Sequence, residues 1–129
     1  MPEADASREA GRWLARGEAD LRLSRAGLEQ RTLFEPWHVC FHAQQAAEKA
    51  IKALLVLHQT RFPFTHDLPA LAALLDARPK ADDALPWLSL WAAAARYPGE
   101  AEPAWADAER AVTIARDVVA DARARLPTP

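Results

Sequence analysis

Helix-favouring residues fill this chain between spaced prolines, and no segment of length alternates apolar and polar residues as a β-strand does. Alanine is the commonest residue and arginine is frequent, whereas glycine occurs only 4 times. Alanine and arginine are among the residues most favourable to an α-helix. A chain with this pattern builds its core by packing helices against one another, so the sequence predicts an all-α fold.

Capping residues and prolines divide the sequence into four main helices and a short one. Pro36 and Pro103 suit the first turns of two helices, and Asp67 or Thr65 can cap the short one. The expected helices cover, in order, about residues 7–31, 36–59, 67–75, 82–97 and 103–126. Because the connections are short, neighbouring helices should run antiparallel. The expected architecture is an up-and-down four-helix bundle with an additional short helix, formed by a single domain of residues 1–129.

The charge balance excludes one class of function. Sixteen Lys and Arg residues against 18 Asp and Glu residues give a formal net charge of −2, so bulk positive charge cannot attach this chain to nucleic acid. Any contact with RNA would have to be local. The single cysteine, Cys40, excludes an intramolecular disulfide, and no apolar run approaches the roughly 20 residues that cross a bilayer. The first residues lack the charged-then-apolar order of a signal peptide, so we expect a cytoplasmic protein without membrane contact.

Polar and small residues separate onto two faces of the second expected helix. At about 100° per residue, five side chains that can donate hydrogen bonds project within roughly 40° of one line: His38, His42, Gln45, Lys49 and Lys52. A second set points away from that line, with alanines small enough to admit a neighbouring helix closely: Val39, Ala43, Ala46, Ala47, Ala50 and Leu54. One face should therefore pack, and the other should offer donors to a ligand.

Three segments of the chain together resemble a known family. They are the run from His42 to Leu55, the residues Thr65-His66-Asp67-Leu68 and the residues Ala95-Arg96-Tyr97-Pro98. In this order they resemble the HEPN family, the nucleotide-binding domain shared by prokaryotes and higher eukaryotes, and with the flanking helices the resemblance spans about residues 8–126. The resemblance implies a helical module that binds a nucleotide or a partner. The members that this chain resembles are those encoded beside a minimal nucleotidyltransferase, so the resemblance also implies that the chain could form one half of a toxin–antitoxin-like pair.

Side chains would have to hold any phosphate, because the scattered glycines form no phosphate-binding loop. Lys49, Lys52 and Arg96 are the leading candidates for that contact. An equally weighted alternative is that Glu48 and Lys52 form an ordinary i,i+4 ion pair while Lys49 is solvated. The full set of candidate nucleotide- or partner-binding residues is His42, Gln45, Lys49, Lys52, His66, Arg96 and Tyr97.

The ribonuclease members of the family carry an arginine followed four to six residues later by a histidine, and the pair acts on RNA without a metal. Arg96 matches that arginine, but residues 97–103 include no histidine that could move a proton. Arg61 and His66 have the spacing in the wrong helix context, so His66 is expected to be a cap or loop-ordering residue. We therefore expect a binding module with no catalytic residues. The competing interpretation is a metal-independent endoribonuclease toxin, in which His66 or His42 replaces the missing histidine.

Other chemistries receive little support from the sequence. Glu35 and His38 have the spacing of a bundle di-metal site, but no second such pair exists, so neither a metal nor a cofactor is expected. Cys40 lies between apolar residues in mid-helix and should be a buried thiol. The 5 tryptophans should mostly pack in the core or between copies, although Trp87 and Trp91 could stack on a base.

Self-association is a further expectation. Alanine-rich helices carrying 5 tryptophans expose more apolar surface than one small bundle can bury, so we expect a homodimer or higher homo-oligomer. The other expected partners are a minimal nucleotidyltransferase protein and a nucleotide or RNA.

Overall fold

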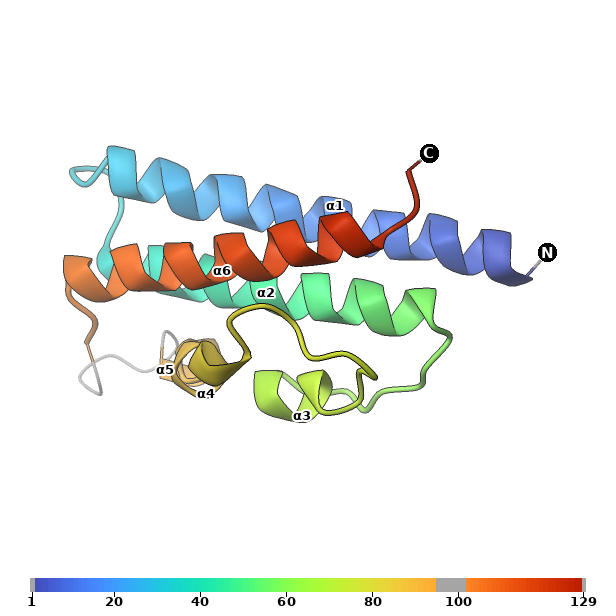
Figure 1. The fold of residues 1–129 in the computed structure, drawn as a ribbon. Helices are drawn as coiled ribbons and strands as arrows, with labels where there is room; N and C mark the ends of the chain where they lie inside the picture. The colour runs from blue at the N-terminus through green and yellow to red at the C-terminus, as the bar shows by residue number, and fades with distance from the viewer. Residues whose placement is uncertain (1, 95–101, 129) are drawn as a thin grey trace.

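Three long helices form the body of the molecule. The computed structural model describes residues 2–94 and 102–128, and within them α1 (Pro2–Glu29), α2 (Pro36–Leu57) and α6 (Trp105–Arg125) pack against one another. α1 runs in the opposite direction to α2 and α6, and α1 begins at the end of the bundle where α6 finishes (Figure 1). None of the helices in the described part has the length and hydrophobicity of a membrane-spanning segment. No strand occurs among the described residues, and the predicted all-α bundle is confirmed.

Short helices, rather than one long helix, occupy the fourth position of the bundle. In chain order they are α3 (Leu68–Ala72), the 3₁₀ helix η1 (Asp82–Ala84), α4 (Leu85–Ser89) and α5 (Trp91–Ala94). Three of them, α3, α4 and α5, lie beside α2, and α4 also contacts α6 (Figure 1). The continuous helix expected over residues 82–97 is divided because Leu90 donates its N–H only three residues back, to the Trp87 carbonyl at 3.2 Å, which tightens the turn between α4 and α5. The expected end of that helix, with Arg96 and Tyr97, lies outside the described residues.

α2 is the central helix, since it packs against α1, α6 and the short helices. The predicted packing face of α2 is confirmed, because all of its members are buried: Val39, Ala43, Ala46, Ala47, Ala50 and Leu54. Facing it, α1 buries leucines and the small residues between them: Ala10, Leu14, Gly17, Leu21 and Ser24. Small side chains on both helices let the two backbones approach closely.

The predicted cap of the short third helix is confirmed at Asp67. Its carboxylate accepts a hydrogen bond from the Ala70 N–H at 3.2 Å. α3 ends at Ala72, earlier than predicted, because the N–H groups of Leu74 and Leu75 bond to carbonyls three residues back. The chain therefore continues as a tight turn instead of an α-helix.

Glycines on α1 mark the closest approach to α2. A Cβ atom on Gly27 would lie 2.5 Å from the Val39 Cγ2 atom, and one on Gly17 would lie 3.0 Å from the Ala46 carbonyl oxygen. Gly11, on the same helix, has nothing within 4 Å of the corresponding position. The contact with α2 thus requires the absence of a side chain at Gly17 and Gly27 but not at Gly11.

Alanine substitutions at two of these glycines should have opposite effects. Gly27→Ala should lower the free energy of unfolding by about 1–3 kcal/mol, because the added methyl group overpacks against buried Val39. Gly11→Ala should raise it by about 0.5–1 kcal/mol, because alanine is favoured over glycine inside a helix. Urea unfolding of both variants measures the difference, and an equal gain in stability for both would contradict the close contact at Gly27.

Candidate functional site

A buried carboxylate organises the polar side chains of α2. Glu48 is 3% exposed and Lys52, one turn later, is 5% exposed. The Glu48 carboxylate meets the Lys52 ammonium at 3.1 Å, the His66 Nδ1 atom at 2.8 Å and the Gln44 amide at 3.3 Å. We call these four residues the Glu48 cluster. Because both charges have left water, these contacts replace their hydration, and loss of either partner would leave an uncompensated buried charge.

The Glu48 cluster also fixes the segment between α2 and α3. The Gln44 amide donates to the His66 carbonyl oxygen at 3.2 Å, and the Ser89 hydroxyl donates to the same oxygen at 3.2 Å. Ser89 Oγ in turn accepts the Leu68 N–H at 2.9 Å. His66 is thus held through both its ring and its backbone, which is the arrangement expected of a loop-ordering residue.

Three aromatic rings lie within about 6 Å of the Lys52 ammonium, although Phe64, the most distant of them, is itself exposed. Its Nζ atom lies 5.7 Å from the ring centroid of Trp13, 5.6 Å from that of Phe62 and 6.0 Å from that of Phe64. Cation–π attraction adds to the ion pair with Glu48. Lys52 therefore lies inside the bundle, where binding a phosphate would require it to leave both the ion pair and the rings.

A second carboxylate ties α1 to α2. Asp20 of α1 accepts a hydrogen bond from Lys49 and lies 3.1 Å from the His42 Nδ1 atom. Burial by itself would raise the pKa of Asp20, but the hydrogen bonds to His42 and Lys49, together with the charges of these groups, outweigh it and hold that pKa below its ordinary value. Lys49 therefore forms an ion pair with Asp20. The alternative prediction that Lys49 is simply solvated is wrong.

The donor stripe predicted on α2 is engaged within the chain. Besides the contacts of His42, Lys49 and Lys52, Gln45 donates to the Gln44 Oε1 atom at 2.7 Å. The alternative prediction of an i,i+4 ion pair between Glu48 and Lys52 is confirmed, but this ion pair is buried and is not an ordinary surface pair. Arg96 and Tyr97, the other two candidates, lie outside the residues that the structure describes.

Three residues of these networks were not predicted from the sequence: Asp20, Gln44 and Ser89. Asp20 is a carboxylate next to buried Leu21 on α1, and Gln44 is an amide among the buried alanines of α2. A polar residue inside an apolar stripe is the signal that could have found Asp20 and Gln44, because such a group must have a partner when it is buried.

The remaining candidates have structural roles. His38 accepts the Glu35 N–H through Nδ1 at 2.9 Å and so caps the start of α2. Among the described residues, no group of three His, Cys, Asp or Glu side chains is placed to hold a metal ion. Burial raises the pKa of Cys40 to about 12, so its thiol stays protonated. Trp87 and Trp91 contact each other edge to face, with 5.8 Å between ring centroids.

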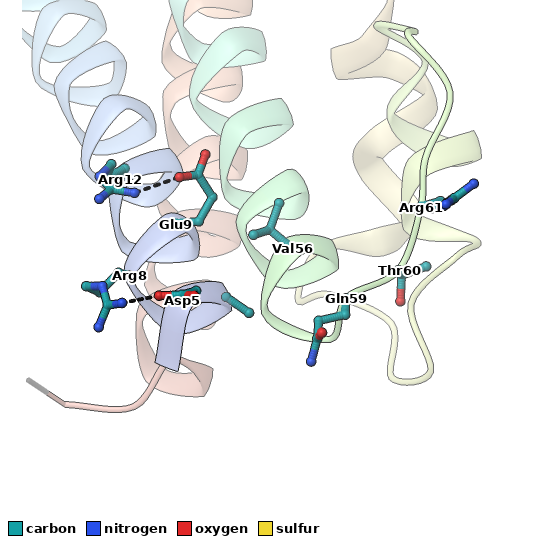
Figure 2. A pocket seen from close by; sticks show the side chains of 9 residues that line it. Asp5, Arg8, Glu9, Arg12, Val56, Gln59, Thr60 and Arg61 are labelled. Carbon is teal, nitrogen blue, oxygen red and sulfur yellow. Dashed lines mark hydrogen bonds and ion pairs between the residues drawn. The ribbon is translucent and has the colours of Figure 1, made fainter. Parts of the chain in front are cut away.

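Two adjoining hollows follow the junction of α1 and α2, and we call them together the α1–α2 groove. The wider one, of about 640 Å³, opens between the start of α1 and the end of α2 (Figure 2). The narrower one, of about 260 Å³, shares Glu9 and Arg12 with it. Its full lining is Glu9, Arg12, Trp13, Arg16 and Lys49.

The narrow part of the α1–α2 groove is basic and has an aromatic wall. Arg12 in the narrow part is bonded to Glu9, and Arg8 in the wider part is bonded to Asp5 (Figure 2), so most of the charge of these two arginines is compensated. Arg16, in contrast, makes no ion pair with any residue that the structure describes. An uncompensated guanidinium beside an indole ring can bind a phosphate and offer a stacking surface to a base.

Comparison with known proteins places the chain in a family. A family model described as the HEPN domain matches residues 10–124. A crystal structure of TT1696 from Thermus thermophilus is similar, with 27% sequence identity and a TM-score of 0.76, and the match covers 91% of this chain and 98% of that one. No curated protein matches the chain. The likeness to TT1696 therefore extends over nearly the whole domain.

Acid should weaken the fold partly through Asp20. Since its pKa is lower in the folded than in the unfolded chain, the ionised carboxylate stabilises the fold above its ordinary pKa of about 4, and this contribution is lost as the pH falls through the lower folded value. Asp20→Asn should therefore be less stable than the wild type near neutral pH and lose less stability on acidification. Urea unfolding across a pH series tests this, with exposed Asp76→Asn as the control. Parallel pH profiles for Asp20→Asn and the wild type would contradict the prediction.

Proposed function

The chain belongs to the HEPN domain family, and from that membership we propose that it is a nucleotide-binding module that pairs with a minimal nucleotidyltransferase and does not cleave RNA. The observation that supports this most is the narrow part of the α1–α2 groove, where Trp13, Arg16 and Lys49 line one hollow. These three side chains combine a free cation, a fixed cation and an aromatic ring.

A nucleotide needs both an anion site and a surface for its base. Arg16 supplies a guanidinium that no described residue compensates, and Lys49 supplies an ammonium whose position Asp20 fixes. The Trp13 ring packs edge-on against Phe62, with 6.3 Å between centroids, so its orientation is set before a base arrives. The hollow of about 260 Å³ at these residues meets one of about 640 Å³, and the wider one is within the range of size typical of small-molecule sites.

The histidines argue against a ribonuclease. Beyond His66 the sequence contains no further histidine, so none follows Arg96. The Nδ1 atom of His66 is bonded to buried Glu48, and that of His42 to Asp20. General acid–base catalysis needs an imidazole within hydrogen-bond reach of the reacting ribose hydroxyl. The endoribonuclease toxin remains the second candidate, and it requires one of these two rings to serve Arg96 from another helix.

The proposed protein partner, a minimal nucleotidyltransferase, rests on the family resemblance, and the gene neighbouring this one is the direct place to look for it.

Homo-oligomerisation is also part of the proposal. The tryptophans support it less than expected, since Trp91 is buried. Most of the support comes from other large apolar side chains that are exposed to solvent. Phe64 is 98% exposed, Leu33 71% and Leu90 62%.

Nucleotide binding should depend on Arg16. Titration calorimetry with ATP should detect binding to the wild type and a loss of about 1.5–3 kcal/mol of binding free energy for Arg16→Ala, because a charge-assisted contact to phosphate is removed. Arg110→Ala is the matched control, since Arg110 is an exposed arginine that lies on the Trp87 ring at 4.1 Å, away from the groove. Equal affinity of Arg16→Ala and the wild type, or no binding at all, would contradict the assignment of the groove.

RNA should not be cleaved faster by the purified protein than by buffer. The expected reason is that no histidine follows Arg96, so no imidazole is supplied at the place where the ribonuclease members carry one. The assay uses an RNA oligonucleotide with chelator present, which removes contaminating metal-dependent nucleases. Cleavage that disappears in both Arg96→Ala and His66→Ala would establish the ribonuclease instead, and nucleotide titration of the same preparations keeps the two outcomes separate.

A further inference from the structure

A second groove, between α1 and α6, is lined by arginines, and we call it the arginine groove. It has a volume of about 380 Å³. Each helix contributes residues at positions i, i+3, i+4 and i+7: Glu18, Leu21, Arg22 and Arg25 from α1, and Arg116, Val119, Ala120 and Arg123 from α6. At one end of the groove, Arg123 Nε of α6 donates a hydrogen bond to Glu18 Oε2 of α1 at 3.2 Å, which fixes the position of one helix along the other.

Most of the positive charge in the arginine groove has no counter-ion among the residues that the structure describes. Arg123 is paired with Glu18, whereas Arg22, Arg25 and Arg116 make no side-chain hydrogen bond or ion pair with any described residue. All three are exposed. In a chain with a net charge of −2, such a concentration of positive charge is local, and it favours an anionic partner on this face.

The lining of the arginine groove suits a helix better than a phosphate. Its floor is apolar, with Leu21, Val119 and the small, exposed Ala120 between two arginine-bearing walls. Every lining residue lies inside a helix, so no free backbone N–H and no hydroxyl points into the groove, although such donors are common in phosphate sites. An apolar floor gains nothing from a phosphate chain, whereas it can pack against the apolar stripe of a helix.

The pair of helices already accepts a helix on its other face. α1 and α6 contact each other, and both contact α2, which covers the groove between them on that face. The arginine groove is the uncovered counterpart. Arginine stems can cover apolar surface while their guanidinium groups reach carboxylates at the rim, as charged residues flanking a helical seam do.

We propose that the arginine groove docks an amphipathic helix of a partner protein, one that carries carboxylates on both flanks of a narrow stripe of small apolar residues. Arg22 and Arg25 bind the carboxylates of one flank, and Arg116 binds those of the other. Ala120 admits the backbone of the docked helix closely. This surface is distinct from the α1–α2 groove, so the proposal does not depend on nucleotide binding.

Synthetic peptides test the proposal. The probe is a fluorescein-labelled peptide of about 18 residues, roughly five helical turns, with alanine and leucine on one face and glutamate on both flanks. A second peptide replaces each glutamate with glutamine, and a third with lysine. Fluorescence anisotropy at low salt should show binding of the glutamate peptide and at least about tenfold weaker binding of the glutamine peptide.

Variants of exposed groove residues then locate the site. The double variant Arg22→Gln with Arg116→Gln should weaken binding of the glutamate peptide about tenfold or more, whereas Arg110→Gln should not change it. Arg22→Glu with Arg116→Glu should reverse the preference to the lysine peptide. Circular dichroism melts confirm that each variant is folded.

The outcomes that overturn the proposal are equally defined. They are no binding of the glutamate peptide at low salt, equal binding of the glutamate and glutamine peptides, or unchanged binding by the Arg22 and Arg116 double variants. Tighter binding of a single-stranded RNA oligonucleotide, abolished by the same variants, would assign the groove to phosphate instead. Since Arg16→Ala and ATP test the α1–α2 groove separately, failure here leaves that result untouched.

Discussion

The Glu48 carboxylate is the contact on which the arrangement of this bundle depends. A carboxylate inside a protein is costly unless charge and hydrogen bonds replace its water. Lys52, His66 and Gln44 do so, and the network also reaches outward, because Gln44 and Ser89 both bond to the His66 carbonyl. A single charge on α2 thereby positions the chain entering α3 and, through Ser89, the end of α4. The short helices that take the place of a fourth long helix are attached to α2 through this network as well as by apolar contact.

This use of charge changes which residues are free to bind ligands. Lys52 is held by a carboxylate and by the nearby rings of Trp13 and Phe62, and Lys49 is shared with Asp20, so both lysines of α2 contribute first to the bundle. Among the described residues, the cations without ion pairs in the two grooves are instead Arg16, Arg22, Arg25 and Arg116 on α1 and α6, together with Arg61 in the segment after α2. A phosphate or carboxylate can reach these guanidiniums without breaking an internal ion pair.

Much of the fold could be predicted because it follows from periodicity within single helices. The packing face of α2 was visible from the spacing of Val39, Ala43 and Ala50, and the Asp67 cap from the residue type and its place before an apolar run. The division of the expected fourth helix near Leu90 was not visible, because a turn with three-residue hydrogen bonds uses the same residues as a helix with four-residue ones. The candidate site was harder to predict, because its ion pairs and hydrogen bonds are between residues that are far apart in the sequence. The donor stripe of α2 has the predicted helical spacing, but its role depends on Asp20, which lies 22 residues from His42 and 29 from Lys49.

α1 is the element that relates the two proposed surfaces. Arg16 and Arg22 are six residues apart, so at about 100° per residue their side chains project roughly 120° apart around the helix. One therefore faces the α1–α2 groove and the other the arginine groove. Asp20, between them in sequence, turns to α2 and binds Lys49, and Gly17 and Gly27 keep the two helices in close contact. A helix held this firmly can present a nucleotide site and a docking surface at a fixed distance from each other, so occupation of one surface need not rearrange the other.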